Sequence, residues 1–518
     1  MKVRLLLATV TVCVLAVEPA AAAAPVAPTT VAVSSTAGSP FADCAADLPD
    51  LQRSLGAVDF ANSEVEPYLA VNPTNPDNLI AVWQQDRWSG GGARGNLAGV
   101  SFDGGETWET VVVTRSSACT GNAFWARATD PWVTFSPDGT AYFMHLGVYS
   151  PLVPLPDTFA VDGMLVTRSH DGGLTWEEST ELVLDTSATS MHDKNTITAD
   201  PNNSSFVYAV WDRLNSPPSD NGNPTAFENA AVFAGDTIFT RSTDGGETWE
   251  PIRTILKASA YDQTIANQIV VRPASAGGDL VNVFSLIHEK SNTGESRGWN
   301  VAAQTSSDHG ATWSTAVTAA RMLPNPTVDP DTGLPVRAGA IGVDAAVDPT
   351  SGSVFAVWQD ARFSGGAYND VALIASTDGG RTWSRPIAVP RALTGVAGLN
   401  RQSFTPQVHV SADGRLAVSY YDFRRNDGSG ASETDYFVNQ CAAPDVSEPD
   451  LCDGDWVESR VTAQSFDIRT AAKPDDRGFF LGDYVGLADV PGAFATAFSV
   501  SSAGDPATVH YSTVPFTP

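Results

Sequence analysis

One octapeptide pattern, S-x-D-x-G-x-T-W, recurs five times along the 518 residues of the chain. The copies span Ser101–Trp108, Ser169–Trp176, Ser242–Trp249, Ser306–Trp313 and Ser376–Trp383. Their aspartates are separated by about 64 to 73 residues. Self-similarity at a nearly constant period is typical of repeat architectures, in which each unit buries its apolar face against the next. The pattern therefore predicts a series of similar units over most of the chain.

Each copy of the octapeptide is expected to form a β-hairpin turn, because it lies between two short apolar runs. The aspartate can accept hydrogen bonds from backbone N–H groups and from the Ser and Thr hydroxyls of its own turn. The glycine at the fifth position permits a positive φ without steric cost. The tryptophan is too large to remain on a turn and is predicted to pack between neighbouring sheets. We therefore expect these residues to be structural and not catalytic.

The octapeptide resembles the Asp-box, or bacterial neuraminidase repeat, of sialidases and related β-propellers. This resemblance covers nearly all of the chain after its N-terminal segment, and it implies a β-propeller fold. The same box also occurs in non-catalytic propellers and in other glycosidases. The resemblance therefore implies an architecture more strongly than it implies a substrate.

A second repeat marks the first strand of each expected unit. Several copies are followed by similar second strands, such as Leu79–Trp83 and Val354–Trp358. Strand, turn, strand, loop, strand, box and strand together make one four-stranded blade. We predict an all-β propeller with seven blades, and six blades are the alternative. The seven copies begin at Glu66, Asp130, Asp193, Asn267, Asp344, Thr405 and Gly482.

The N-terminal sequence has the pattern of a secretory signal peptide. Basic residues precede an apolar run from Leu5 to Val17, and a small-residue zone follows near Ala22–Ala24. We divide the chain into a signal peptide at 1–24, a linker with a possible ring-closing strand at 25–60, and the propeller at 61–518. No later apolar stretch approaches the ~20 residues that span a bilayer. We expect a secreted, extracellular protein.

The net charge of the chain narrows the classes of partner that it is expected to bind. The net charge of −29 and the absence of a basic patch argue against nucleic acid and anionic membranes as partners.

The four cysteines after the signal allow three pairings, of which Cys441–Cys452 with Cys44–Cys119 is preferred. No cysteine or histidine spacing suits a metal centre, so no cofactor is expected to be required. The acidic loops Asp329–Asp331 and Asp450–Asp455 could hold a structural Ca²⁺.

One rim of the predicted propeller collects charged residues. The start of each first strand and the end of each second strand lie on this rim, opposite the boxes. A guanidinium fork binds a carboxylate in a bidentate manner, so arginines at the second-strand ends are predicted to bind an acidic substrate. These arginines are Arg87, Arg213, Arg362 and Arg424.

Carboxylates on the same rim could supply acid and base groups for glycosidic cleavage. We select Glu66, Asp130, Asp193, Glu289 and Asp483 as catalytic candidates. A tyrosine nucleophile is what the resemblance to sialidases implies, and Tyr484, next to Asp483, is the candidate. The Arg-Ile-Pro of sialidases does not occur, and Glu66-Pro-Tyr stands where its arginine is expected. The site residues are therefore chosen by their position in the repeat.

These patterns favour a secreted, sialidase-like glycoside hydrolase that removes terminal sialic or other acidic sugars from extracellular glycans. A monomer acting on a glycan or glycoconjugate is expected. The alternative is a non-catalytic propeller that binds glycans or protein partners through the same rim, and a polysaccharide hydrolase or lyase is a third hypothesis. Arginines that each pair with a neighbouring carboxylate would favour the alternative, whereas arginines that converge would favour the hydrolase.

Overall fold

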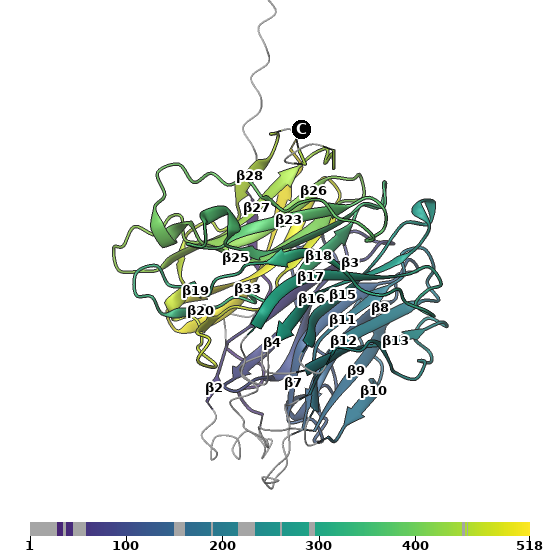
Figure 1. Ribbon diagram of the computed structural model, residues 1–518. Coiled ribbons are helices and arrows are strands. Elements are labelled where there is room, and N and C mark those ends of the chain that lie inside the picture. Colours follow the sequence, from purple (N-terminus) through teal and green to yellow (C-terminus); the bar gives the residue numbers. More distant parts are fainter. Residues whose placement is uncertain are drawn as a thin grey trace, which may run out of the picture.

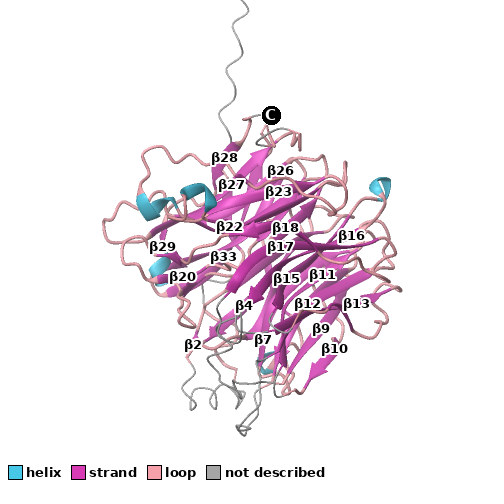
Figure 2. Ribbon diagram, viewed as in Figure 1, coloured by secondary structure: helices cyan, strands magenta, loops and turns pink. Residues whose placement is uncertain are grey.

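The computed structural model describes residues 28–34, 38–44, 58–149, 161–187, 190–215, 234–259, 262–289, 296–447, 451–452 and 454–517. Over these ranges the protein is all-β, and its helical elements are short 3-10 turns such as Ala118–Thr120 (Figure 2). Among the same residues, no helix has the length and apolar character needed to cross a membrane. The predicted signal peptide at 1–24 lies outside the described residues.

The first eight strands after residue 64 form two antiparallel groups of four. Within each group every strand pairs with the next along the chain. A bridge between β5 and β7 joins the groups into one sheet, to which β2 (Asp59–Phe60) adds an edge. The groups are β3 (Val65–Val71), β4 (Leu79–Trp88), β5 (Ala93–Ser101) and β6 (Glu109–Val112), then β7 (Arg127–Phe135), β8 (Ala141–Val148), β9 (Asp162–Ser169) and β10 (Thr180–Asp185).

The next two groups repeat this arrangement, again with antiparallel pairing in chain order. A short parallel contact between β13 and β15 connects them. Their strands are β11 (Ser190–Ala199), β12 (Val207–Asn215), β13 (Ala234–Ser242) and β14 (Arg253–Leu256), then β15 (Asp262–Val271), β16 (Leu280–Glu289), β17 (Ser296–Ser306) and β18 (Val317–Met322).

The fifth and sixth groups form separate sheets. A small third sheet pairs β20 with β30 in parallel and so joins segments far apart in sequence. The two groups are β21 (Asp344–Val347), β22 (Val354–Asp360), β23 (Asp370–Ser376) and β24 (Ile387–Ala388), then β25 (Ser403–Val410), β26 (Leu416–Asp422), β27 (Glu433–Cys441) and β28 (Val457–Arg460), with β29 (Phe466–Asp467) on β27. The small sheet contains β19 (Thr327–Val328), β20 (Pro335–Arg337) and β30 (Phe479–Phe480).

The last group combines the two ends of the chain. Strands β31 (Gly486–Val490), β32 (Ala493–Ser502) and β33 (Asp505–Pro515) pair in order, and β1 (Thr29–Ala32) adds to the far side of β33. The N-terminal segment, which was predicted to be a linker with a possible ring-closing strand, thus supplies the outer strand of a sheet made by the C-terminus. Figure 1 shows the groups following one another from purple β4 through teal β16 to yellow β33.

Neighbouring groups touch through their first strands and share their apolar cores. Strand β3 contacts β7, and the same contact joins β7 to β11, β11 to β15, β15 to β21, β21 to β25, β25 to β31 and β31 to β3. One core cluster, for example, combines Met144 of β8 with Trp211 of β12. A fully buried large side chain contributes about 1.5–3 kcal/mol to the free energy of unfolding, so these shared clusters stabilise the packing of one group on the next.

The Asp-box turns have the predicted hydrogen bonds. In the third copy, Ser242 Oγ donates to Asp244 Oδ1 (2.7 Å), and the N–H and Oγ1 of Thr248 donate to the same carboxylate (2.9 and 2.6 Å). The other four copies have the same three bonds. Gly246 has a φ of +84°. These bonds keep the pKa of Asp244 below its usual value, although burial opposes them. The structural prediction for these turns is confirmed.

Each box also packs on the preceding group of strands. Tyr142 Oη of β8 donates to the carbonyl of Gly245 (2.8 Å), and Arg168 of β9 donates to the same carbonyl (3.1 Å). The box tryptophans pack against the apolar clusters, as Trp249 does against the cluster that contains Trp211. The predicted packing of these tryptophans between sheets is therefore confirmed.

Two disulfides have the preferred pairing. Cys44 bonds to Cys119, and Cys441 bonds to Cys452, with Cα–Cα distances of 5.5 and 5.9 Å. The first ties the N-terminal segment to the loop after β6. The second closes the insert that replaces an Asp-box in the sixth group.

Candidate functional site

A backbone irregularity recurs at the beginning of the first strands. Five of these strands have a β-bulge with one residue at positive φ, between +50° and +58°. A bulge turns a side chain away from the regular alternation of the strand. The five residues at this position are Glu66, Asp130, Lys194, Ala266 and Thr405.

Three of these bulge residues are charged and gather on one rim. Lys194 Nζ donates to Glu66 Oε1 (3.2 Å) and to Asp483 Oδ2 (2.8 Å). The backbone N–H of Lys194 donates to Asp130 Oδ2 (3.2 Å). We call Glu66, Asp130, Lys194, Arg337 and Asp483 the rim cluster. Lys194 and Asp483 have 17% and 12% of their side chains exposed, so these two connect an otherwise buried cluster to the surface.

Arg337 enters the rim cluster from the small sheet. Its guanidinium donates to Asp483 Oδ2 (2.7 Å) and to Asp475 Oδ2 (3.0 Å). The same guanidinium lies 4.1 Å from the centre of the Phe480 ring. The parallel pairing of β20 with β30 places Arg337 opposite Phe480, and so brings it to the rim.

The carboxylates of the rim cluster have pKa values that move in opposite directions. Burial raises the pKa of Glu66, and the nearby Asp130 and Asp483 raise it further, although Lys194 opposes them. Burial also raises the pKa of Asp130. The pKa of Asp483 lies well below its usual value, because Arg337 and Lys194 outweigh the effect of burial. One region therefore holds carboxyl groups that favour the protonated form beside one that stays ionised.

Arg87 lies buried beside this cluster, and it forms no ion pair with a carboxylate of the described residues. Its Nη1 donates to Gln84 Oε1 (2.6 Å), and its guanidinium lies 5.4 Å from the Phe480 ring centre. Its Nε is buried and has no hydrogen-bond partner in the part of the chain that the structure describes. Burial and the neighbouring Arg337 lower the pKa of Arg87. This guanidinium thus has a hydrogen-bond donor left over for an anionic group.

Aromatic side chains line the cluster on another side. Tyr68 stacks on Trp132 at a ring-centre distance of 3.7 Å, and Tyr484 meets Trp132 edge-on at 5.2 Å. Tyr484 Oη donates to the carbonyl of Pro131 (3.2 Å). Burial and the carboxylates of the cluster raise the pKa of Tyr484 well above its usual value. The phenol is therefore held in its neutral form.

The remaining predicted arginines do not join Arg87. Each forms a salt bridge with a carboxylate outside the rim cluster. Arg362 and Arg424 pair within their own groups of strands, whereas Arg213 pairs with a residue of the preceding group. The pairs are Arg213 with Asp185 (2.9 Å), Arg362 with Asp360 (2.8 Å) and Arg424 with Asp422 (2.6 Å). The structure therefore shows local pairing of these arginines, whereas only Arg87 lies beside the rim cluster.

The other predicted residues have mixed outcomes. Asp193 lies beside the bulge and accepts the backbone N–H of Lys194 (2.9 Å). The side chain of Glu289 lies outside the described residues. In the proposed calcium loops, Asp329 accepts the N–H of Asp331 (3.0 Å), while Asp450 lies outside the described residues. Over the part of the chain that is described, no three His, Cys, Asp or Glu side chains are grouped so as to hold a metal ion.

Sequence reasoning missed Lys194 and Arg337. The signal for Lys194 was present, because Pro73, Pro137 and Pro201 each follow seven residues after Glu66, Asp130 and Lys194. Counting back from the proline thus identifies Lys194, and not Asp193, as the third bulge residue. Arg337 belongs to neither repeat, and its position depends on the pairing of β20 with β30.

Comparisons with known proteins identify the repeat. Residues 240–251, which contain the third box, match the family model described as BNR/Asp-box repeat. No curated protein matches the chain. The chain thus carries the Asp-box repeat, and this identification from sequence is confirmed.

Several solved structures are similar to the chain at low identity. An α-L-arabinanase of Penicillium chrysogenum complexed with arabinobiose has 12% identity and a TM-score of 0.44, with 95% of this chain and 99% of that chain covered. The intramolecular trans-sialidase from Ruminococcus gnavus has 14% identity and a TM-score of 0.42, with coverages of 88% and 96%. A protein of unknown function from Dyadobacter fermentans has 13% identity and a TM-score of 0.45, with coverages of 88% and 95%.

Proposed function

We propose that the protein is a secreted glycoside hydrolase of the sialidase type, which removes terminal sialic or other acidic sugars from extracellular glycans. The proposal includes a closed seven-bladed propeller at 61–518, completed by β1. Seven groups of four antiparallel strands, with first strands that contact one another in succession and back to β3, support that count. The two disulfides and the signal-like N-terminus support an extracellular location.

The observation that carries the proposal is the opposite shift of carboxyl pKa values around Lys194. Glycosidic cleavage needs a protonated carboxyl group to donate to the leaving oxygen, and an ionised carboxylate to stabilise or attack the sugar carbon. Glu66, with Asp130 beside it, suits the first role because its pKa is raised. Asp483 suits the second role because its pKa is lowered.

This assignment changes the role expected of Tyr484. An attacking phenol must lose its proton, but the surroundings of Tyr484 raise its pKa and its hydroxyl donates to a backbone carbonyl. We assign Asp483 the ionised role and propose that Tyr484, with Trp132 and Tyr68, forms an apolar wall for the sugar ring.

The acidic sugar is inferred from Arg87. A buried guanidinium with an unused Nε–H can bind a substrate carboxylate by a charge-assisted hydrogen bond. Arg337 is neutralised by Asp475 and Asp483, and we propose that it holds Asp483 ionised and in place.

A non-catalytic binding propeller is the second candidate function. The local salt bridges of Arg213, Arg362 and Arg424 favour it, because they show that arginines at this position can be purely structural. A ligand-binding rim that contains Arg87 and the aromatic wall would remain in that case.

Release of a fluorogenic aglycone from an α-sialoside tests the proposal. The mature protein, assayed with and without Ca²⁺, is expected to turn over the substrate, and Glu66→Gln is expected to lose this activity. A folded protein that binds sialyllactose without turnover would support the binding propeller. A folded protein that neither binds nor hydrolyses sialosides would reject the acidic-sugar assignment.

A further inference from the structure

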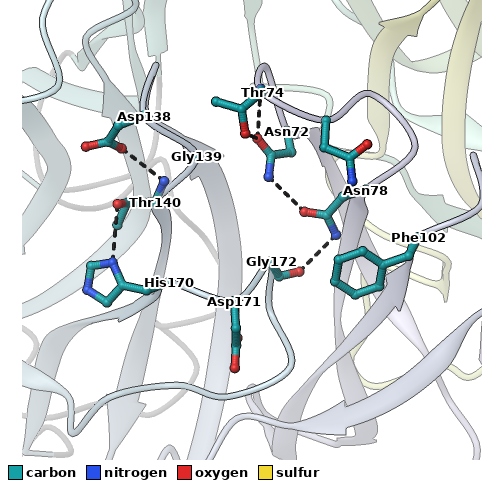
Figure 3. A pocket seen from close by; sticks show the side chains of 11 residues that line it. Asn72, Thr74, Asn78, Phe102, Asp138, Gly139, Thr140, His170, Asp171 and Gly172 are labelled. Atoms are coloured by element: carbon teal, nitrogen blue, oxygen red, sulfur yellow. Dashed lines mark hydrogen bonds between the residues drawn. The ribbon is translucent and has the colours of Figure 1, made fainter.

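A pocket of about 380 Å³ lies on the Asp-box face, between the first and second groups of strands. Figure 3 shows Asp138, Thr140 and His170 on one side and Asn72 and Phe102 on the other. These residues come from the β3–β4 and β7–β8 turns and from the first two boxes. We call this the interbox pocket. It lies on the face opposite the rim cluster, and a ligand bound here would not depend on the proposed function.

The pocket occurs where a bridging arginine is replaced by a smaller residue. At the two following boundaries, the residue directly before the box serine is an arginine that reaches the next box. Arg168 donates to the carbonyl of Gly245 (3.1 Å), and Arg241 donates to the carbonyl of Asp308 (3.2 Å). The equivalent residue at the first boundary is Val100. At this boundary the Gly172 carbonyl accepts instead from Asn78 of the β3–β4 turn (3.0 Å), whose side chain is shorter than that of arginine. Among the described residues, no guanidinium lines the pocket between the turns.

The second position of the box also differs at this boundary. Phe102 and His170 occupy it in the first two copies, and both line the interbox pocket. The later copies have the small residues Thr243, Ser307 and Thr377 at this position. The Phe102 side chain is large and apolar, yet 48% of the residue is exposed. The box itself does not require a phenylalanine here, since the other four copies form the same turn without it.

The polar lining is held rigidly. Asn72 Nδ2 donates to Asn78 Oδ1 (3.0 Å), and Asn72 Oδ1 accepts from Thr74 Oγ1 (2.8 Å). Thr140 Oγ1 lies 3.3 Å from His170 Nδ1. An amide nitrogen has two hydrogens, so Asn72 Nδ2 has one left over, within the described residues, after its bond to Asn78. Polar groups fixed in advance lose little freedom when a ligand binds.

We propose that the interbox pocket binds a neutral saccharide, with a sugar ring packed on Phe102 and its hydroxyls bonded to the polar lining. The apolar C–H face of a sugar ring suits an exposed aromatic side chain, and its hydroxyls suit amide, hydroxyl and carboxylate groups. The lining includes Asp138 and Asp171 but neither lysine nor arginine. This charge disfavours an acidic sugar and distinguishes the pocket from the site around Arg87.

Isothermal titration of the mature protein tests this proposal with cellotriose, xylotriose, maltotriose and lactose as neutral probes and 3′-sialyllactose as the anionic probe. At least one neutral probe is expected to bind with a Kd of about 1 mM or tighter. Phe102→Ala should weaken it about tenfold, because an aromatic contact is lost. Val100→Arg should abolish it, because the new guanidinium would reach the Gly172 carbonyl and could pair with Glu109, as Arg168 pairs with Glu177.

Thr243→Ala, at the second position of the third box, is the matched control and should leave binding unchanged. Thermal unfolding of each variant establishes that it is folded. The proposal fails if no neutral probe binds, or if the Kd is unchanged in Phe102→Ala. It also fails if Glu66→Gln removes the binding, because the saccharide would then occupy the rim cluster.

Discussion

The Asp-box turns and the rim cluster are both built on repeated backbone, but only the turns repeat their side chains. In all five boxes the serine hydroxyl donates to the aspartate at 2.7 to 2.9 Å. At the first-strand bulges the backbone recurs with φ between +50° and +58°, yet the residue changes from Glu66 to Asp130, Lys194, Ala266 and Thr405.

This difference distinguishes the residues that stabilise the fold from the residues that could take part in chemistry. The box aspartates serve the turn that contains them, and hydrogen bonds from their own turn lower their pKa values, as in Asp103, whose pKa falls to about 2. The rim carboxylates serve no turn, and burial raises the pKa of Glu66 and Asp130. Identical side chains at repeated positions indicate a structural role, whereas different charged side chains on the same backbone position indicate a site.

The largest expected effect is on turnover. Glu66→Gln keeps the shape of the side chain but removes the proton that we assign to the leaving oxygen. The kcat should fall about 10²–10⁴-fold, the usual contribution of a general acid. Asp308→Asn, in a box, should leave kcat unchanged, and equal losses in both variants would erase the distinction. In the wild type, activity should fall as the pH rises through the raised pKa of the acid, because the proton to be donated is lost.

The second effect is on stability alone and compares two glycines of one box. Gly380 has a φ of +84°, and an added Cβ would lie 2.7 Å from Val281 Cγ1 in the packed core. Gly380→Ala should lower the free energy of unfolding by about 2–4 kcal/mol through backbone strain and overpacking. Gly379→Ala meets the flexible end of Arg272 and should cost only the ~1–2 kcal/mol of a positive φ. Chemical denaturation measures both, and turnover per folded molecule should not change.

The third effect compares two arginines of the rim. Arg87→Met removes the guanidinium with an unused donor and should raise KM about 10–100-fold, the value of a charge-assisted hydrogen bond. Arg362→Ala removes a guanidinium already paired with Asp360 and should leave KM unchanged. Steady-state kinetics on the sialoside, with KM measured for both variants, would show which of the two arginines binds the substrate. A larger loss in Arg362→Ala would restore the prediction that this arginine binds substrate.

The fourth effect lies at the edge of the rim. Glu64, two residues before Glu66, accepts from Ser34 Oγ and from the N–H of Val509 (3.3 Å), and so joins the N-terminal segment to β33. Burial raises its pKa to about 8, and Asp505 adds to this effect. The folded state therefore binds an extra proton above pH 4.5, and stability should fall as the pH rises toward 8, by about 1.4 kcal/mol per pH unit for this group.

Glu64→Gln should reduce this slope without changing kcat. Thermal unfolding at pH 5 and pH 8 measures the effect. An unchanged slope would mean that Glu64 does not carry the proton. A loss of activity would place Glu64 with the rim cluster instead of with the structural residues.

Sequence alone predicted the features that depend on residues close together in the chain. A box turn holds its own aspartate, serine and threonine within eight residues, so the pattern predicts the hydrogen bonds directly. Disulfide pairing followed in the same way for Cys441 and Cys452, which are close in sequence. Glu66, Asp130, Asp483, Tyr484 and Arg87 were placed on one rim by the same repeat logic, and the structure brings them together.

The tertiary structure determined which charged side chains form ion pairs with one another. Arg213, Arg362 and Arg424 occupy the repeat position of Arg87, but nearby carboxylates pair with each of them. Arg337 reaches Asp483 only because β20 pairs with β30, across more than a hundred residues of chain. Ion pairs depend on distances between distant segments, and no local pattern specifies those distances. The sequence by itself thus determined the repeated unit and its turns, whereas packing of one unit on another determined the charged site.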